Sequence, residues 1–425
     1  MPRLAAFATD CAITFDGRKI PARTGESIAS ALLAAGIPLV ARSAKYHRPR
    51  GPFCLAGSCG SCLVRAGGMP GQRACRTACR DGLRVTSQNA FPGAAHDLLG
   101  AIDLVFPRGI DHHHLMTGFA PANRAAVAFS RRLAGMGRLP DTLPPAAAAP
   151  GEDVFDALVV GAGPAGLGAA EALAAARRRI LLAEAEPALG GRLRARLGLP
   201  GEPDAAWPVR VADAVRAAGG EAAAGGVVLG LWRDGGTPLA LLREPERLRL
   251  VRARRVVLCP GGHPEPPDIP GGDRPGVLAA RGVLALLAEH GVLPGERIAV
   301  LGSGPEADAA AARLAEAGAD ARRVPEAVRV LGRGRVRALL LAGGARLPCD
   351  AAAVATPPLP AIDLARQLGA AVTLDAGRGA FAVQADASGR TSVPGLLAAG
   401  EATGIPSTPA AVEAGRRAGT EAARA

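Results

Sequence analysis

The stretch "VFDALVVGAGPAGLGAAEALAAARRRILLAEAE" (residues 154–186) decides the fold class of this 425-residue chain. An apolar strand at 157–160 runs into a glycine turn and a helix, and a second apolar strand at 180–183 ends at Glu184. This order is typical of a dinucleotide-binding β-α-β unit, in which the helix N-terminus faces the phosphates. We therefore predict that Glu184 accepts hydrogen bonds from the ribose hydroxyls.

Each glycine of the turn has its own expected role. The first makes the tight turn, the second admits the pyrophosphate, and the third lets helix and strand pack closely. The candidate residues of the first dinucleotide site are therefore the three glycines, Gly161, Gly163 and Gly166, and the two residues between the last two, Pro164 and Ala165.

Later stretches favour FAD as the dinucleotide. "PALGGRLR" (187–194) stands where the second flavin-side loop commonly lies, so Gly191 and Arg192 are candidate cofactor contacts. "RRVVLCPGGHPEPPDIPG" (254–271) resembles the strand and glycine-containing crossover that leaves an FAD domain.

The C-terminal stretch "TSVPGLLAAGEATGIPSTPAAVEAGRRAG" (391–419) resembles the segment that delivers an acid beside the flavin ribitol. Here the pair is Gly400 and Glu401, where aspartate is more usual after the glycine. We expect both residues at the FAD site, with the following helix pointing its N-terminus at the flavin.

A second fingerprint, "ERIAVLGSGPEADAAAARLAEAGA" (296–319), gives a strand, Gly302-x-Gly304 and a helix. It predicts a second nucleotide-binding fold of the NAD(P)H type inserted into the FAD domain. Whether this fold binds NAD(P) or is a structural remnant stays open on the sequence alone.

The continuation of the second fold is unusual for a nicotinamide site. Asp320 precedes the next strand, although the ribose-binding acid should end it. Arg322 and Arg323 would suit a 2′-phosphate, which favours NADPH over NADH. Pro325 breaks the strand where the pocket wall would be, so we predict that neither nucleotide reduces the flavin at a useful rate.

A second decisive stretch is "GPFCLAGSCGSCLVRAGGMPGQRACRTACRDG", which begins at residue 51 and holds five of the eight cysteines. Cys54-x4-Cys59-x2-Cys62, followed by Cys75, is the spacing of plant-type [2Fe–2S] ferredoxins. Glycines between the cysteines let the loop turn tightly and aim N–H groups at the sulfur atoms. These four cysteines are the predicted metal ligands.

Other arrangements of the cysteines fit the spacing less well. Cys79 lies four residues after Cys75 and is a rival fourth ligand, although the spacing favours Cys75. A structural zinc site would use two close cysteine pairs, and only Cys59 and Cys62 form one. Disulfides are disfavoured in a reducing cytosol.

The segment before the cysteines, "CAITFDGRKIPARTGESIASALLAAGIPL" (11–39), predicts a hairpin and a helix. The hairpin turns at Asp16-Gly17, and an apolar stripe follows at helical spacing. Thr24 is the expected N-cap, and Gly36 suits the helix end. A hairpin, a packed helix and a cluster loop together indicate a β-grasp ferredoxin domain.

Three further stretches carry a resemblance to a known family: "GESIASALLAAGI" (25–37), "RSAKYHRPRGPFC" (42–54) and "GSCGSCLV" (57–64). They resemble the N-terminal region of the sarcosine oxidase α-subunit family. That family includes subunits of proline, hydroxyproline and opine dehydrogenases and of hydrogen cyanide synthase. Because this sequence keeps all four cluster cysteines, it is most similar to the [2Fe–2S]-bearing branch.

The predicted fold class is α/β: a two-dinucleotide-binding, Rossmann-like flavoprotein with an N-terminal β-grasp [2Fe–2S] domain. We expect five segments: the β-grasp domain (1–95), a linker and docking segment (96–150), the first part of the FAD domain (151–268), the inserted nucleotide-binding-like domain (269–355), and the FAD return segment (356–425). The His112–His114 run is expected at a surface or interface, and the Pro/Ala-rich 140–151 stretch as linker.

The composition excludes several classes of function. The formal net charge is +12, but arginines supply nearly all of it along the whole chain, and aromatics are only 3%, which disfavours nucleic acid binding. No run approaches the roughly 18 apolar residues of a membrane span. No leader-like segment opens the chain, so a cytoplasmic location is expected.

FAD and a [2Fe–2S] cluster together convert two-electron flavin chemistry into one-electron steps. The resemblance implies that the substrate, an amine or amino acid, is oxidised on an amino acid oxidase-like flavoprotein partner subunit, so we assign no catalytic residue to this chain. Two alternatives stay open: a self-contained NAD(P)H-dependent reductase, and a structural subunit with a resident adenine nucleotide such as NAD or ATP.

Overall fold

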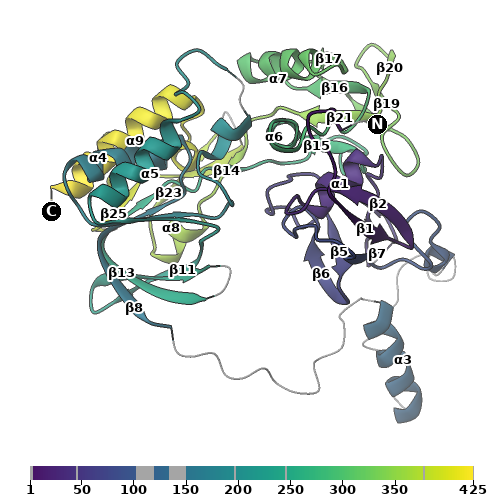
Figure 1. Ribbon diagram of the computed structural model, residues 1–425, viewed down its shortest axis with the longest axis horizontal. Helices are drawn as coiled ribbons and strands as arrows, with labels where there is room; N and C mark the ends of the chain where they lie inside the picture. Colours follow the sequence, from purple (N-terminus) through teal and green to yellow (C-terminus); the bar gives the residue numbers. More distant parts are fainter. Residues whose placement is uncertain are drawn as a thin grey trace. The chain divides into compact units, whose positions relative to one another are not determined.

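This computed structural model describes residues 3–44, 46–101, 119–133, 150–195, 198–244, 247–376 and 379–424. The chain divides into two compact units (Figure 1). Unit 1 comprises residues 1–144 and 266–356, and unit 2 comprises residues 145–265 and 357–425. The five-segment division stays a prediction. His112–His114 and most of the 140–151 stretch lie outside the described residues.

The N-terminal part of unit 1 is a five-stranded sheet in the order β2-β1-β7-β5-β6. β1 pairs antiparallel with β2 and parallel with β7. The elements of this part are β1 (Cys11–Phe15), β2 (Arg18–Ala22), α1 (Ile28–Ala34), β3 (Ala41–Arg42), β4 (Pro49–Arg50), β5 (Leu63–Ala66), β6 (Met69–Arg73), β7 (Arg84–Ser87), η1 (Leu98–Ala101) and α3 (Ala120–Leu133). The predicted turn is present, with positive φ at Asp16 and Gly17.

Helix α1 covers this sheet with its apolar stripe, and Ile28, Leu32 and Leu33 are fully buried or nearly so. Its N-cap is Ser27, whose Oγ accepts the N–H of Ser30 at 3.1 Å. The expectation that Thr24 caps the helix is wrong. The N–H of Thr24 donates instead to Asp10 at 2.7 Å, which holds Thr24 in the preceding turn.

The second part of unit 1 is a four-stranded parallel sheet in the order β15-β21-β16-β17. Its elements are β15 (Val277–Ala279), α6 (Ala280–His290), β16 (Arg297–Leu301), α7 (Pro305–Glu316), β17 (Asp320–Val324) and β21 (Ala351–Val354), with an antiparallel sheet of β18 (Arg329–Leu331), β19 (Ala338–Leu340) and β20 (Arg346–Pro348). Strand β17 ends immediately before Pro325, which lacks the N–H that a further ladder bond would need.

Unit 2 is built on a seven-stranded sheet in the order β10-β9-β8-β13-β12-β11, with β25 also pairing with β13. The elements of the sheet and its helices are β8 (Glu152–Val160), α4 (Pro164–Ala175), β9 (Ile180–Glu184), α5 (Trp207–Ala217), β10 (Glu221–Ala224), β11 (Val227–Asp234), β12 (Thr237–Arg243), β13 (Leu248–Leu258), β25 (Leu396–Ala398) and α9 (Thr408–Ala423). Smaller elements are η2 (Gly191–Ala195), β14 (Gly262–His263), β22 (Leu359–Pro360), α8 (Asp363–Gln367), β23 (Val372–Asp375), β24 (Ala380–Val383) and η3 (Gly400–Thr403).

Helices α4, α5 and α9 lie together over one face of the unit 2 sheet (Figure 1). Ala157 and Val159 of β8 face these helices, whereas Leu158 and Val160 belong to the core on the opposite face. Both faces of the central strands are therefore buried, as is typical of a parallel sheet in an α/β protein. No helix among the described residues has the length and apolar character needed to cross a bilayer.

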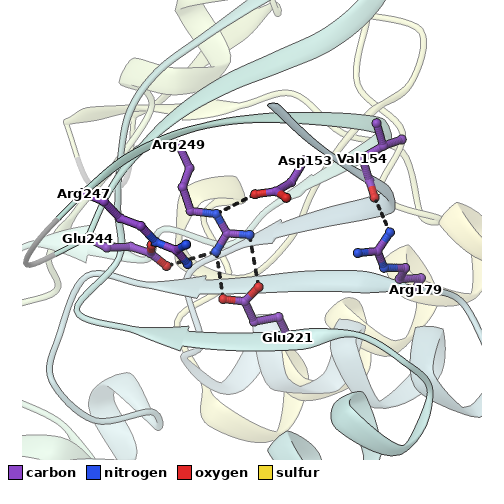
Figure 2. A network of polar contacts seen from close by, with 7 residues as sticks. All are labelled: Asp153, Val154, Arg179, Glu221, Glu244, Arg247 and Arg249. Carbon is purple, nitrogen blue, oxygen red and sulfur yellow. Dashed lines mark hydrogen bonds and ion pairs between the residues drawn. The ribbon is translucent and has the colours of Figure 1, made fainter. Parts of the chain in front are cut away.

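A buried arginine lies at the end of the sheet where β8, β10 and β13 begin (Figure 2). Arg249 is only 5% exposed, and its guanidinium donates to Asp153 at 2.8 Å, to Glu221 at 2.8 and 3.1 Å, and to Glu244 at 3.1 Å. Burial opposes the charge, yet the hydrogen bonds to Glu221 and Asp153 outweigh it and raise the pKa of Arg249. Since the nucleotide fingerprint follows the other end of β8, this network is structural.

We predict that Arg249→Met lowers the free energy of unfolding of unit 2 by about 2 kcal/mol, because Asp153 and Glu221 lose their cation and Glu244 keeps only the exposed Arg247. The partial exposure of Asp153 and Glu221 keeps the cost below that of a fully buried pair. Both tryptophans, Trp207 and Trp232, lie in unit 2, so urea unfolding followed by tryptophan fluorescence reports on this unit.

Arg247→Met is the matched control for this measurement. Arg247 also pairs with Glu244, but its side chain is 61% exposed, so we expect a much smaller change. Equal losses in the two variants would show that Arg249 has no special structural role.

Candidate cofactor sites

Four cysteines converge at the loop that precedes β5. The thiol of Cys54 lies within hydrogen-bonding contact of Cys59 and Cys75, and Cys62 contacts Cys75. These contacts lower the pKa of Cys54 and Cys62 and raise the pKa of Cys59 and Cys75. The N–H groups of Ala56 and Cys59 also point at the Cys54 sulfur, at 3.4 and 3.5 Å.

These thiols fit a [2Fe–2S] cluster, which takes four cysteine ligands and hydrogen bonds to its sulfur atoms. They contact one another in series, in the order Cys59, Cys54, Cys75 and Cys62, so all four thiols are gathered where one cluster would need them. In the described part of the chain, no three His, Cys, Asp or Glu side chains surround a point that could hold a single metal ion.

Cys79 lies apart from these four. It is 2% exposed, and burial together with the charges of Glu26 and Cys11 raises its pKa to about 12. Its N–H donates to the carbonyl of Glu26 at 2.6 Å, beside the start of α1. The structure therefore brings Cys75, not Cys79, to the other three predicted ligands.

The cluster loop packs against the second nucleotide fold of the same unit. The carbonyl of Phe53 accepts the N–H of Ala279 at 2.9 Å, immediately before α6 begins. A Cβ on Gly282, in the first turn of α6, would lie 2.7 Å from the carbonyl oxygen of Cys54. Only glycine allows this helix to approach the ligand loop so closely.

The other end of α6 contacts the start of the chain. Arg3 donates to the carbonyl of His290 at 3.2 Å and to the buried carboxylate of Glu26 at 2.6 Å, and the N–H of Leu4 donates to Gly291 at 2.8 Å. Helix α6 therefore touches the β-grasp domain at both of its ends, which positions the ligand loop.

We predict that Cys62→Ser, purified anaerobically, loses the visible absorbance of the cluster and the EPR signal of its reduced form, because a ligand thiolate is removed. Cys79→Ser makes the same atomic change at a buried cysteine of the same domain and should keep one [2Fe–2S] cluster per chain by iron analysis. Loss in Cys79→Ser together with retention in Cys75→Ser would reverse the ligand assignment.

The first dinucleotide fingerprint has the steric features that its glycines predict. Gly161 has φ +91°, and a Cβ there would lie 2.3 Å from the carbonyl oxygen of Cys259. A Cβ on Gly166 would lie 1.7 Å from the carbonyl oxygen of Gly161. At Gly163, the N-cap of α4, a Cβ would meet only Gly191 at 4.0 Å, which leaves the room that a pyrophosphate needs.

Pro164 and Ala165 open α4, and Glu184 ends β9. The Glu184 carboxylate is 7% exposed and accepts the N–H of Ala162 at 2.7 Å and the N–H of Glu186 at 2.8 Å. Burial raises the pKa of Glu184. Because each carboxylate oxygen has a further lone pair, Glu184 is held at the glycine turn with capacity left for ribose hydroxyls.

The structure also brings the two later FAD segments to this turn. Arg192 lies one residue after Gly191 and pairs with Glu401 at 3.0 Å, and both side chains are nearly buried. Gly400 has φ +79°, and a Cβ there would lie 2.7 Å from the Cβ of Ala165. Sequence reasoning placed Arg192 and Glu401 at the same cofactor but missed their ion pair.

The second fingerprint folds as its glycines predict, but its helix carries acids in the first turn, whereas α4 of the first fingerprint carries none there. Gly302 has φ +138°, and Gly304 is the N-cap of α7 with φ +91°. The first turn of α7 carries two acids, and Glu306 pairs with Arg281 at 3.0 Å. These carboxylates lie at the helix end that would face a pyrophosphate.

The two arginines expected to meet a 2′-phosphate are both paired with carboxylates. Arg323 contacts Asp308 of α7 at 2.8 Å, and Arg322 contacts Asp320 at 3.1 Å. Asp320 begins β17 and does not end it, as the sequence indicates. Sequence reasoning missed the α7 acids as a feature of this site, although "GPEAD" (304–308) showed them.

Comparison with known proteins agrees with the description of the cysteine site and with that of the dinucleotide-binding folds. Residues 8–90 match the 2Fe-2S iron-sulfur cluster binding domain family, and residues 155–334 match the pyridine nucleotide-disulphide oxidoreductase family. The structure is similar to that of L-proline dehydrogenase from P. horikoshii, with a TM-score of 0.73 and 23% identity, covering 97% of this chain and 72% of that one. At this identity the likeness supports the fold alone.

Two relatives are similar in sequence. The alpha subunit of sarcosine oxidase from Rhizobium meliloti (strain 1021) is 32% identical over 72% of this chain and 33% of its own length. Hydrogen cyanide synthase subunit HcnA of Pseudomonas aeruginosa is 39% identical over 19% of this chain and 79% of its own length. The chain spans about a third of the length of the sarcosine oxidase subunits that it matches.

The fold and sites define an oxidoreductase that combines a [2Fe–2S] domain with an FAD/NAD-type dinucleotide-binding fold. The chain belongs to the sarcosine oxidase α-subunit-like family, which includes HcnA and a subunit of opine oxidase. The predictions of family, of fold class, and of a [2Fe–2S] cluster with an FAD/NAD-type dinucleotide are thereby confirmed.

Proposed function

We propose that this chain is the FAD- and [2Fe–2S]-containing electron-transfer subunit of a hetero-oligomeric amine or amino acid dehydrogenase. The substrate, a secondary amine or amino acid such as sarcosine, proline, hydroxyproline or an opine, is oxidised on an amino acid oxidase-like flavoprotein partner. The observation that carries the proposal is the convergence of four thiols in a chain that also has a dinucleotide turn with room for pyrophosphate. The relatives are subunits by name, which supports a partner.

When bound, the flavin takes up electrons in pairs and the cluster passes them on singly. The residues of this chain bind and orient these groups. Gly163 would leave room for a pyrophosphate at the N-terminus of α4. Glu184 would accept hydrogen bonds from the ribose hydroxyls, and the ion pair of Arg192 with Glu401 links the two later FAD segments.

The NAD(P)H-dependent reductase is the weaker alternative, because carboxylates occupy the first turn of α7 and the arginines beside it are paired. The other alternative, a structural subunit, differs from the proposed electron-transfer subunit in the nucleotide bound at the first fingerprint, which would be NAD or ATP in place of FAD. The fingerprint glycines and Glu184 recognise an adenosine diphosphate moiety, which FAD, NAD and ATP share. Identification of the bound nucleotide separates these cases.

We predict that denatured, freshly purified protein releases FAD. Glu184→Gln should lower nucleotide occupancy about tenfold, because a charge-assisted hydrogen bond to the ribose weakens. Glu413→Gln, an exposed acid on α9 of the same unit, is the matched control and should keep full occupancy. Release of NAD or ATP without flavin would favour the structural subunit.

The second fold is tested by rapid mixing. We predict that neither NADH nor NADPH bleaches the flavin in stopped-flow experiments, because carboxylates occupy the first turn of α7 and the arginines that would meet a nucleotide phosphate, Arg322 and Arg323, are paired with carboxylates. Dithionite should bleach the flavin in the same sample, which shows that the flavin is reducible. Fast bleaching by either nucleotide would instead support the self-contained reductase.

A further inference from the structure

We propose that the surface around the exposed edge of the cluster loop docks an acidic one-electron carrier protein. This inference rests on the proposed electron-transfer function and names the class of partner that the cluster site accepts.

The charge of the cluster-bearing segment is entirely of one sign. Residues 48–80 contain six arginines and no aspartate, glutamate or lysine, although the whole chain has 38 acids against 50 basic residues. Arg73, Arg76 and Arg80 of this segment are exposed. No acid within the segment pairs with these three arginines, although Arg50 pairs with Asp273 at 3.1 Å. The exposed arginines give this part of unit 1 a positive surface.

Two of these arginines flank the ligands. Arg76 follows Cys75, and its aliphatic stem lies over the ligand loop, since a Cβ on Gly57 would be 2.9 Å from its Cγ. Arg73 ends β6 opposite Leu63, the residue after Cys62. In the described part of the chain the Arg73 side chain has no carboxylate within ion-pair distance, so its charge is available to a partner.

The predicted ligands differ in solvent exposure, and this difference indicates which edge of the cluster a carrier protein would approach. Cys54, Cys62 and Cys75 are buried, whereas Cys59 is exposed. An electron reaches the surface most directly at Cys59, which follows by two residues the Gly57 that the Arg76 stem covers. The positive surface and the accessible edge of the cluster thus lie on the same part of unit 1.

Charge complementarity favours an acidic protein as the occupant. Opposite charge steers a carrier to the site and raises its association rate. Single-stranded nucleic acid binding would need exposed aromatic platforms, but the single aromatic residue of the segment, Phe53, is 5% exposed. The step that follows docking is one electron leaving the reduced cluster and one electron entering the oxidised carrier, with no bond formed or broken.

The test uses the full chain with its cofactors, reduced anaerobically with dithionite, desalted and mixed with a one-electron acceptor. The acceptors are plastocyanin, an acidic blue-copper protein, and cytochrome c, a basic haem protein. We expect Arg73→Glu to lower the second-order rate with plastocyanin about tenfold at low ionic strength and to raise the rate with cytochrome c. Both differences should vanish at high salt.

Arg346→Glu, on β20 outside the cluster segment, makes the same change in net charge and should leave both rates within about twofold. Arg76→Glu is a second variant at the site. Absorbance and EPR of the cluster check that every variant retains it. Equal effects of Arg73→Glu and Arg346→Glu would overturn the proposal, since overall charge would then explain the rates.

Unchanged rates in both site variants would also overturn the docking site. So would a loss of duplex DNA binding in Arg73→Glu with unchanged carrier rates, because the surface would then serve nucleic acid. These results leave the proposed function standing, since the cluster is reduced chemically and no partner subunit is needed. A wild-type chain that binds no cluster would overturn both proposals.

Discussion

Close approach of backbone to backbone is the constraint on which the structure depends. At the first nucleotide turn, Gly166 packs directly on the carbonyl of Gly161, and a methyl group there would overlap it. The same constraint joins α4 to α9, because a Cβ on Gly415 would lie 1.9 Å from the carbonyl of Ala165. Because α9 follows Gly400 and Glu401, the glycine contacts also hold the C-terminal segment beside the turn.

A similar close approach of two backbone segments occurs at the predicted iron–sulfur site. Gly282 lets α6 touch the carbonyl of Cys54, so the ligand loop is supported by the second nucleotide fold as well as by its own sheet. This packing supports the ligand loop whether or not a nucleotide binds at the second fold.

Arginine serves different purposes in the two units, and its surroundings decide which. Arg249 is buried among three carboxylates, where it satisfies charges that the sheet brings together. Arg73 is exposed in a segment without acids, where its charge faces solvent. A buried, paired guanidinium stabilises the fold, whereas the charge of an exposed guanidinium can steer a partner of opposite charge.

The sequence by itself determined the fold class, the two fingerprints and the candidate cluster ligands, because these depend on local spacing: glycines at a turn, cysteines on a loop, and apolar residues at strand and helix periods. The spacing also favoured Cys75 over Cys79 as the fourth ligand, and the path of the chain brings Cys75 to the other thiols. Local reasoning missed the cap at Ser27, because the Thr24 side chain hydrogen-bonds to Asp10, 14 residues earlier in the chain, and does not reach the start of α1. Tertiary structure alone paired Arg192 with Glu401, 209 residues apart, and Arg323 with Asp308. Electrostatic partners of this kind depend on distance in space, and spacing along the chain does not encode it.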